Sequence, residues 1–456
     1  MMGLKGKNVL VFGAGISGVS AAQVLHEQDA IVTLADAKEQ QQAKAAASLE
    51  GLAGKVVLAM GRQDEGLLDG KDLLILSPGI SIHHPLVQAA DARGIPVWSE
   101  IELAGLLCGA PIIAVTGTNG KTTTTTLLGE MMKTTFSEVV VGGNIGAALS
   151  QEVQHVSPTG CVVAEISSFQ LEGVHAFHPH IAVMLNLTPD HIDRHGSFAG
   201  YGATKEKIFA NQTKQDFAVL NQDDEWVRDM ASRIHSRAFF FSRQLELDQG
   251  AFVSNGKLCL RWNGKEDVVC DIQDMKLFGG HNVENALAAC SAAYLAGVSP
   301  QNMARVLTSF SGVEHRIEPV ITLNGVTYYN DSKATNPESS IKALEAFAGH
   351  IILIAGGRDK NTDLSELMKL ARDRVDQLIL IGEAADRFEA AARKHGVQNI
   401  FRAPTMEAAV EKAKAEATPP QVVLLSPACA SYDMFDNYEQ RGRVFKALVL
   451  QGPVLA

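Results

Sequence analysis

Residues 115–122 read Val-Thr-Gly-Thr-Asn-Gly-Lys-Thr and follow an apolar run at residues 111–115. This order predicts a short buried strand, a glycine-rich turn, and a helix over about residues 121–133. Backbone N–H groups of such a turn, with the positive end of the helix dipole, form a cradle for phosphate. Lys121 can reach the β- and γ-phosphates of a nucleotide, and the hydroxyl of Thr122 can bind Mg²⁺. The predicted triphosphate site consists of Gly117, Thr118, Asn119, Gly120, Lys121 and Thr122.

Length, charge and cysteine content narrow the class of protein. The 456 residues suffice for about three domains of ordinary size, and 46% of them are hydrophobic. A net charge of −11 argues against a nucleic-acid partner, because phosphate backbones attract basic surfaces. The six cysteines are scattered without paired spacing, which is typical of a reducing cytosol, and no stretch is long enough to span a bilayer. We therefore expect a cytoplasmic protein without membrane insertion. A monomer is expected as well.

Alternating strands and helices divide the chain into three α/β stretches, at residues 1–100, 101–312 and 313–456. Short connections between them predict parallel sheets with right-handed crossovers. The fold class is accordingly α/β, with a Rossmann-like first domain, a P-loop central domain with a mainly parallel sheet, and a Rossmann-like last domain. Polar and apolar residues alternate over about 238–269, which favours an antiparallel part there. Strands are predicted at residues 8–12, 31–35, 73–76, 95–98, 111–115, 138–141, 161–165, 181–185, 217–220, 327–330, 351–355, 378–381 and 422–425.

A glycine fingerprint near the amino terminus permits two interpretations. Gly13, Gly15 and Gly18 have the spacing of a dinucleotide-binding turn, and Asp36 ends the next predicted strand, where an acid can bind a ribose. Alone, the pattern indicates an NAD-dependent dehydrogenase. A simple dehydrogenase has no use for the second nucleotide loop at Lys121. Since a helix N-terminus binds any diphosphate, the fingerprint serves a UDP-linked substrate equally well.

Four further features have both a functional and a structural interpretation. Glu165 ends a predicted strand and can bind Mg²⁺, or it is a solvated acid. His191, within the stretch 186–193, can bind a cation, or its Asp and Thr neighbours cap a helix. Lysines 205 and 207 lie on a predicted helix and, alone, indicate only solubility. Asn282 and Asn285 share one helical face and can read an adenine edge, or they cap the helix start.

Several motifs together resemble the Mur ligases, which are ATP-dependent amide-forming enzymes of peptidoglycan precursor synthesis. They occur in the expected order at residues 116–122, 143–146, 165–170, 190–194 and 280–285. Within that family, residues 315–316, 330–336, 425–431 and 437–442 are similar to the members that add D-glutamate to UDP-N-acetylmuramoyl-L-alanine. The resemblance covers almost the whole chain. It implies an enzyme that uses ATP and two Mg²⁺ ions and couples the UDP-sugar to D-glutamate.

The resemblance also implies a role for individual residues. Those facing the UDP-sugar would be Ile16, Ser17, Asp36, Gly79 and Asn144. Those serving catalysis, phosphates and metal would be Lys121, Thr122, Glu165, His191 and Lys205, the last as a carbamate. Those contacting the rest of ATP would be Asn282, Asn285, Arg316, Asp331 and Lys333. Those around D-glutamate would be Thr335, Lys360, Ser431 and Tyr438.

The implied reaction explains why the site needs residues for ATP, for metal ions and for two further substrates. A carboxylate is a poor electrophile, so transfer of the γ-phosphoryl group of ATP converts it to an acyl phosphate. The amine of D-glutamate then attacks and gives a tetrahedral intermediate before phosphate leaves. Other superfamily members, including folylpolyglutamate synthase, are the alternatives of the same class. A dehydrogenase and a non-catalytic nucleotide switch are the alternatives of different classes.

Overall fold

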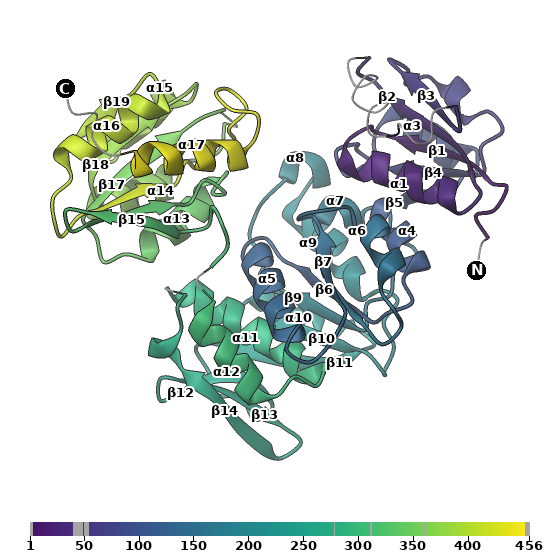
Figure 1. The fold of residues 1–456 in the computed structure, drawn as a ribbon, viewed down its shortest axis with the longest axis horizontal. Helices are drawn as coiled ribbons and strands as arrows, with labels where there is room; N and C mark the ends of the chain where they lie inside the picture. Colours follow the sequence, from purple (N-terminus) through teal and green to yellow (C-terminus); the bar gives the residue numbers. More distant parts are fainter. Residues whose placement is uncertain are drawn as a thin grey trace. The chain divides into compact units, whose positions relative to one another are not determined.

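The computed structural model describes residues 3–39, 49, 54–277, 279–310, 312–359 and 361–451. The chain forms two compact units, Met1–Met275 with Glu284–Thr308, and Lys276–Val283 with Ser309–Ala456. The first unit holds two β-sheets and the second holds one (Figure 1). The predicted α/β fold class is confirmed. Within the described ranges, every helix falls short of the length and apolar character needed to cross a membrane.

The first sheet is parallel throughout, and its described strands run in the order β3-β2-β1-β4-β5. Its central strand has two buried faces, because Val9 and Val11 join one hydrophobic cluster while Leu10 and Phe12 join another. The order reverses between β1 and β4, which is where ligands bind in open α/β sheets. The strands are β1 (Asn8–Phe12), β2 (Ile31–Asp36), β3 (Val56–Met60), β4 (Leu73–Leu76) and β5 (Val97–Ser99). The helices are α1 (Ile16–Glu27), α3 (Pro85–Ala92) and α4 (Glu100–Leu107).

The second sheet follows the order β14-β13-β12-β11-β10-β9-β6-β8-β7 over its described strands. Pairing is parallel from β7 to β12 and antiparallel between β12, β13 and β14. The expected antiparallel part is confirmed for β12–β14. Its first strand, β11, pairs in parallel with both neighbours instead. The strands are β6 (Ile112–Thr116), β7 (Val139–Gly143), β8 (Cys161–Glu165), β9 (Ile181–Met184), β10 (Phe217–Asn221), β11 (Arg237–Ser242), β12 (Gly250–Ser254), β13 (Lys257–Trp262) and β14 (Lys265–Asp271).

Helices α5 to α10 lie between strands of the second sheet along the chain, and α11 and α12 follow its last strand. The helix predicted over about 121–133 is confirmed as α5, and the helix expected to carry Asn282 and Asn285 is confirmed as α11. The boundary between the two units crosses α11 after Val283. The helices are α5 (Lys121–Met132), α6 (Leu149–Glu152), α7 (Ser168–Leu171), α8 (Ile192–His195), α9 (Phe198–Glu206), α10 (Glu225–Met230), α11 (Gly280–Leu295) and α12 (Pro300–Ser309).

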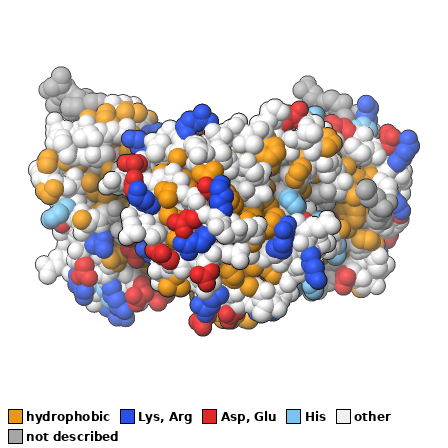
Figure 2. All heavy atoms as spheres, turned by 90° about the horizontal axis from the view of Figure 1, so that it is seen from below, with side chains coloured by type: hydrophobic (Ala, Val, Ile, Leu, Met, Phe, Trp, Pro, Cys, Tyr) orange, Lys and Arg blue, Asp and Glu red, His pale blue; other side chains and the backbone are white. Residues whose placement is uncertain are grey.

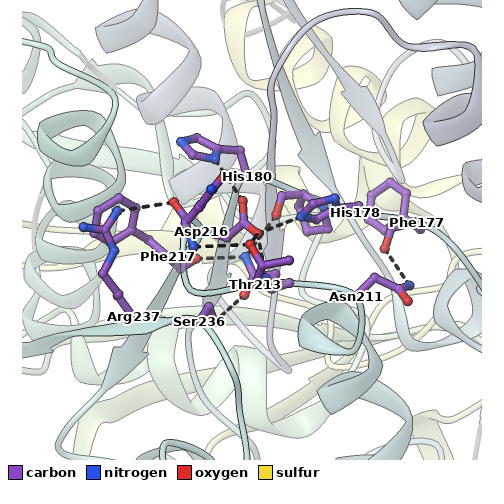
Figure 3. Close-up of polar contacts among 12 residues, drawn as sticks. Phe177, His178, His180, Asn211, Thr213, Asp216, Phe217, Ser236 and Arg237 are labelled. Carbon is purple, nitrogen blue, oxygen red and sulfur yellow. Dashed lines mark hydrogen bonds and ion pairs between the residues drawn. The ribbon is translucent and has the colours of Figure 1, made fainter.

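The amino ends of β9 and β10 are joined by a carboxylate between two imidazoles (Figure 3). Asp216 precedes β10 and pairs with Nε2 of His178 at 2.7 Å and with Nδ1 of His180 at 3.0 Å. It also accepts hydrogen bonds from the backbone N–H and the hydroxyl of Thr213. These bonds hold the pKa of Asp216 at about 2, although its burial opposes the shift. The three groups line a cavity of about 480 Å³ at the edge opposite to the P-loop.

The third sheet belongs to the second unit and has the order β15-β16-β20-β17-β18-β19 over its described strands. Only β15 is antiparallel to its neighbour among these strands. The predicted strands at 327–330, 351–355, 378–381 and 422–425 are confirmed. The strands are β15 (Glu318–Leu323), β16 (Val326–Asn330), β17 (Ile351–Gly356), β18 (Val375–Ile381), β19 (Ile400–Arg402) and β20 (Val422–Leu425). The helices are α13 (Pro337–Glu345), α14 (Ser365–Arg374), α15 (Ala385–Lys394), α16 (Met406–Glu416) and α17 (Tyr438–Leu450).

Acidic and basic side chains are interspersed over the face shown in Figure 2, without a continuous basic field there. A mixed surface of this kind gives a phosphate backbone no extended counter-charge. On this face an anionic ligand would have to be bound by a few local cations.

Candidate active site

Two glycines shape the turn between β6 and α5. Gly120 has φ +85° and stands immediately before α5, and Gly117 has φ +149°. A β-carbon on Gly120 would lie 2.2 Å from Oδ1 of Asn285, and one on Gly117 would lie 2.9 Å from Cβ of Leu185. Only glycine fits these two positions, because other residues would meet both the wrong backbone region and a steric clash. The backbone can therefore turn tightly onto the N-terminus of α5, as a phosphate cradle requires.

The loop that follows β9 supports this turn. The side-chain amide of Asn186 accepts from the N–H of Asn119 at 2.8 Å and donates to its carbonyl at 3.1 Å. The hydroxyl of Thr118 donates to the carbonyl of Thr188 at 3.2 Å and accepts from its N–H at 3.0 Å. These reciprocal bonds fix the turn before any ligand binds. The sequence patterns did not single out Asn186, although its place at the end of a predicted strand was a usable signal.

Two lysines converge on the turn. The ammonium of Lys121 donates to the carbonyls of Gly117 at 2.8 Å and Thr118 at 2.7 Å. The ammonium of Lys205, on α9, donates to the Gly117 carbonyl at 2.9 Å and to the hydroxyl of Thr116 at 3.2 Å. Lys205 is only 1% exposed. The structure thus brings Lys205 to the P-loop, whereas Lys207 is exposed and donates to the carbonyl of Glu172.

Burial changes the acid–base character of Lys205. Loss of hydration lowers the pKa of its ammonium well below the ordinary value, and the charge of Lys121 lowers it further. The carboxylates of Asp190 and Glu165 oppose the shift but do not cancel it. A lysine with a lowered pKa supplies the neutral amine, which is the nucleophilic form.

Glu165 lies at the carboxyl end of β8, buried beside the glycine turn after β7. Its Oε1 accepts from the side-chain amide of Asn144 at 2.9 Å, and its backbone carbonyl accepts from the N–H of Asn144 at 2.8 Å. Its Oε2 is buried without a hydrogen-bond partner among the described residues. A buried, unpaired carboxylate oxygen is costly unless a cation binds it, so this residue fits a hard divalent ion. The site brings Asn144 and Glu165 together.

His191 follows the loop after β9 and precedes α8. It has φ +52°, and its imidazole lies 4.7 Å from the ring of Phe169 and 3.5 Å from the carboxylate of Asp190. The capping position of α8 is His191 itself, and its side chain makes no capping hydrogen bond. The alternative in which Thr188 or Asp190 caps this helix is therefore wrong. The left-handed backbone at His191 places the start of α8 at Ile192, two residues after Asp190 and four after Thr188.

The two asparagines of α11 lie one helical turn apart. Asn285 is 5% exposed, and its Oδ1 accepts from the hydroxyl of Thr124 on α5 at 3.3 Å. Asn282 is 8% exposed, and its N–H donates to the carbonyl of Gly279. The structure places Asn285 against the P-loop turn and its helix. Asn282 lies in the part of α11 that groups with the second unit.

The glycine fingerprint forms a second turn, between β1 and α1. A β-carbon on Gly18 would lie 1.8 Å from the carbonyl oxygen of Gly13, so helix and turn pack as closely as glycine allows. The hydroxyl of Ser77, after β4, donates to that same carbonyl at 2.7 Å. Asp36 accepts from the N–H of Ala14 at 2.7 Å and from that of Lys38 at 2.8 Å. Asp36, predicted to bind a ribose, therefore has a structural role in holding the glycine turn.

The surroundings of this turn include the remaining residues predicted to face the UDP-sugar. Ile16 is 74% exposed at the first position of α1, and Ser17 follows it. Gly79 is exposed in the turn after β4. These residues therefore surround one helix N-terminus, at the switch point of the first sheet.

In the second unit, Asp331 and Lys333 follow β16. Asp331 is 1% exposed and accepts from the N–H of Ile317 at 3.2 Å and the hydroxyl of Ser426 at 2.8 Å. Burial raises the pKa of Asp331 to about 6, and the charge of Arg316 opposes that rise. The ammonium of Lys333 lies 5.5 Å from the centre of the Tyr438 ring. The predicted site residues Arg316, Asp331, Lys333 and Tyr438 therefore lie near one another in this unit.

Arg441 organises the loops around this neighbourhood and was not predicted. It is 1% exposed and donates to the hydroxyl of Ser332 at 3.0 Å and to the carbonyl of Ser332 at 2.8 Å. It also donates to the carbonyls of Cys429 and Ala430, immediately before Ser431. Arg441 thus ties the segment leading to Thr335 to the segment leading to Ser431. Lys360 lies outside the described residues.

A buried lysine and a buried glutamate near a tight glycine turn, together with a second glycine turn on a separate parallel sheet, are typical of a protein that handles a nucleoside triphosphate. Three family descriptions match the chain: the MurD-like N-terminal domain of Mur ligases over residues 7–99, the Mur ligase middle domain over 115–293, and the Mur ligase glutamate ligase domain over 315–429. The chain belongs to the Mur ligase family.

Curated relatives specify the comparison further. The chain is 46% identical to the UDP-N-acetylmuramoylalanine–D-glutamate ligase of Pelotomaculum thermopropionicum, over 97% of each chain. It is 44% identical to the enzyme of the same name from Koribacter versatilis, over 98% of each. Among solved structures, it resembles MurF ligase from Thermotoga maritima in complex with ADP, with a TM-score of 0.60 at 17% identity and coverage of 98% and 95%. The likeness to that structure concerns the fold.

Proposed function

We propose that this chain is an ATP-dependent ligase that adds D-glutamate to UDP-N-acetylmuramoyl-L-alanine in peptidoglycan precursor synthesis. The observation that carries the proposal is the full-length similarity, at 44–46% identity, to relatives named for this reaction. An intact P-loop turn with Lys121 at the start of α5 agrees with it. A dehydrogenase is not supported, because its reaction leaves the P-loop without a role.

The reaction requires activation of an acid. The substrate carboxylate attacks the γ-phosphorus of ATP, ADP leaves, and an acyl phosphate forms. The free amine of D-glutamate then attacks the acyl carbon, loses a proton, and the tetrahedral intermediate expels phosphate. Both reactants carry negative charge, so Lys121 lowers the barrier by stabilising the charge on the transferred group.

We propose that three domains share this work: residues 1–100 hold the UDP-sugar, residues 101–312 hold ATP, and residues 313–456 hold the amino acid. The proposed UDP-sugar contacts are Ile16, Ser17, Asp36, Gly79 and Asn144. The helix dipole of α1 and the close glycine turn favour a diphosphate there. The position of Asn144 against Glu165 supports a location near the reacting carboxylate.

We propose that two Mg²⁺ ions bind at Thr122, Glu165, His191 and Lys205, the last as a carbamate. The unpaired Oε2 of Glu165 supports a cation there. The lowered pKa of Lys205 supports the carbamate, because the neutral amine can add to CO₂ and become an anionic oxygen ligand. Mg²⁺ would offset the charge of the phosphates.

We propose that the remaining ATP contacts come from the P-loop residues Gly117–Thr122 together with Asn282, Asn285, Arg316, Asp331 and Lys333. For D-glutamate we propose Thr335, Lys360, Ser431 and Tyr438. The organisation of Ser332, Ala430 and their neighbours by Arg441 supports a joint role for Thr335 and Ser431. All six cysteines are free thiols, which agrees with a proposed cytoplasmic location. We propose a monomer.

The experiment that tests the function is ADP release from ATP with purified protein and UDP-N-acetylmuramoyl-L-alanine. We expect sustained release and a new amide product only when D-glutamate is added, and no product with L-glutamate. Release without a UDP-sugar would indicate a simple nucleotide hydrolase. No release with any amino acid, or binding of a nicotinamide dinucleotide, would overturn the proposal.

A further inference from the structure

Arg194, on the short helix α8, bonds directly to the turn that follows β4 of the first sheet. Its Nη1 donates to the carbonyl of Pro78 at 3.0 Å, and its Nη2 donates to the carbonyl of Ile80 at 2.8 Å. These two carbonyls flank Gly79. The contact therefore joins the P-loop sheet to the turn proposed to face the UDP-sugar, and both belong to the first compact unit.

The guanidinium of Arg194 is held from two further directions. Its Nε and Nη2 donate to the two carboxylate oxygens of Glu172, at 2.9 and 2.6 Å. Its Cζ lies over the Phe169 ring, 4.0 Å from the ring centre. The side chain of Arg194 is 13% exposed and that of Glu172 is 4% exposed. A planar cation with a bidentate carboxylate on one edge and an aromatic face beside it has one well-defined orientation.

The turn that Arg194 holds is itself fixed to the glycine fingerprint. Ser77 donates to the carbonyl of Gly13 at 2.7 Å, and the N–H of Ile80 donates to the carbonyl of Ser77 at 2.9 Å. A β-carbon on Gly13 would lie 3.2 Å from Cγ1 of Ile80. Movement of this turn would therefore move the diphosphate-binding turn with it.

At its other end, Arg194 is joined to the loop that carries His191. The backbone N–H of Arg194 donates to the carbonyl of His191, the N-cap residue of α8, at 3.1 Å. A bonded path therefore runs from the Gly13 turn through Ser77, Arg194 and His191. It connects the proposed sugar-binding turn with the proposed phosphate and metal site.

We propose that Arg194 is a positioning residue that sets the reacting carboxylate of the UDP-sugar against the γ-phosphorus of ATP. The two substrates are bound by different sheets, and the acid must approach the phosphorus in line. Arg194 sets the distance between the sheets and touches neither substrate. This inference rests on the proposed function and adds a residue to it.

The test is Arg194→Lys, compared with Arg233→Lys as the matched control. Lysine keeps the charge but cannot donate in a planar fork to Glu172 and to two carbonyls together. Arg233, in the turn after α10, forms the same bidentate pair with Glu206 on α9, at 2.8 and 2.9 Å, and its Nη1 donates to the carbonyl of Asp229 rather than to the first sheet. Steady-state kinetics with each substrate, and binding of ADP and of the UDP-sugar, would be measured for both variants.

A misplaced reacting group costs about a hundredfold for 1 Å, so we expect kcat of Arg194→Lys to fall by about ten- to a hundredfold. The KM for ATP and the ADP affinity should stay within about twofold, because the P-loop bonds are untouched. Arg233→Lys should behave as wild type. In Arg194→Ala, added guanidinium ion at millimolar concentration should restore part of kcat without changing the KM for ATP.

Two results would overturn the inference while leaving the proposed function intact. One is an Arg194→Lys enzyme with wild-type kcat. The other is a variant whose only defect is weaker UDP-sugar binding, with normal kcat at saturation. If neither Arg194 variant folds, Glu172→Gln decides: it keeps the size of the partner but loses the charged fork, and unchanged kcat there would contradict the proposal. A wild-type protein that makes no amide product would instead refute the proposed function.

Discussion

Lys121 and Lys205 donate to the same oxygen, the backbone carbonyl of Gly117, at 2.8 and 2.9 Å. Two ammonium groups at one acceptor repel each other, and the charge of Lys121 helps to lower the pKa of buried Lys205. A nucleotide phosphate must compete with the loop carbonyls for Lys121. The pair therefore links the phosphate-binding lysine to the chemical state of its neighbour.

Replacing Lys121 should separate the two substrate sites. We expect Lys121→Ala to lose turnover by on the order of a thousandfold, because the cation that stabilises the transferred phosphoryl group is removed. UDP-sugar affinity, measured by calorimetry, should stay within about twofold, because its proposed contacts other than Asn144 belong to another sheet. Loss of both functions in a well-folded variant would contradict the proposed division of the substrates.

Replacing Lys205 tests the proposed carbamate. Lys205→Arg keeps a positive charge but cannot add CO₂, so we expect a severe loss of turnover. Lys207→Arg, at the exposed lysine on the adjoining turn, is the control and should stay near wild type. Added bicarbonate should not rescue Lys205→Arg, and near-normal turnover of that variant would remove Lys205 from the site.

Asp331 should make the second unit less stable as the pH rises. Its folded pKa of about 6 lies above the ordinary 3.8, so folding takes up a proton between these values and the ionised form is penalised above about pH 6. A pKa shift of one unit corresponds to about 1.36 kcal/mol. Asp331→Asn should therefore raise the free energy of unfolding by about 2–3 kcal/mol at pH 8, and leave it almost unchanged below pH 4. Urea unfolding at both pH values measures this. If Asp331 serves the nucleotide as proposed, turnover falls in the same variant.

Asp216 should make the protein less stable as the pH falls, which is the opposite of the effect of Asp331. Its folded pKa of about 2 lies below 3.8, so its contribution is present above about pH 4 and is lost as the pH falls toward 2. Asp216→Asn should lower the free energy of unfolding by about 2 kcal/mol at pH 7, from 1.36 kcal/mol per unit. Asp229→Asn, at a carboxylate whose side chain is 63% exposed, is the control. A variant as stable as wild type at pH 7 would contradict the role given to this pair of imidazoles.

The sequence predicted the interior strands well and the edge strands poorly. β1, β4, β8 and β20 match their predicted bounds, because continuous apolar runs are buried on both faces. β3, β15 and β19 were not predicted. Each lies at the edge of its sheet and has few buried residues, so its apolar signal is weak.

The candidate site also has a part that the sequence predicted and a part that it did not. The P-loop was predictable because its parts are contiguous and its geometry depends on two glycines at fixed spacing. Arg194 and Arg441 were not, since their partners lie 114 and 109 residues away in the chain. The sequence shows that each arginine lies within a motif, but it does not indicate which distant carbonyl the guanidinium will donate to. The same limit applies to Asp36, whose hydrogen bond to Ala14 spans 22 residues.

That bond has a consequence for mutational scanning of the first sheet. Both oxygens of the Asp36 carboxylate already accept backbone amides, one from Ala14 and one from Lys38. An alanine at this position would leave two amides unsatisfied and loosen the glycine turn, whatever the ligand does. A null phenotype there cannot be assigned to a lost ribose contact, and even asparagine retains an acceptor for only one of the two amides.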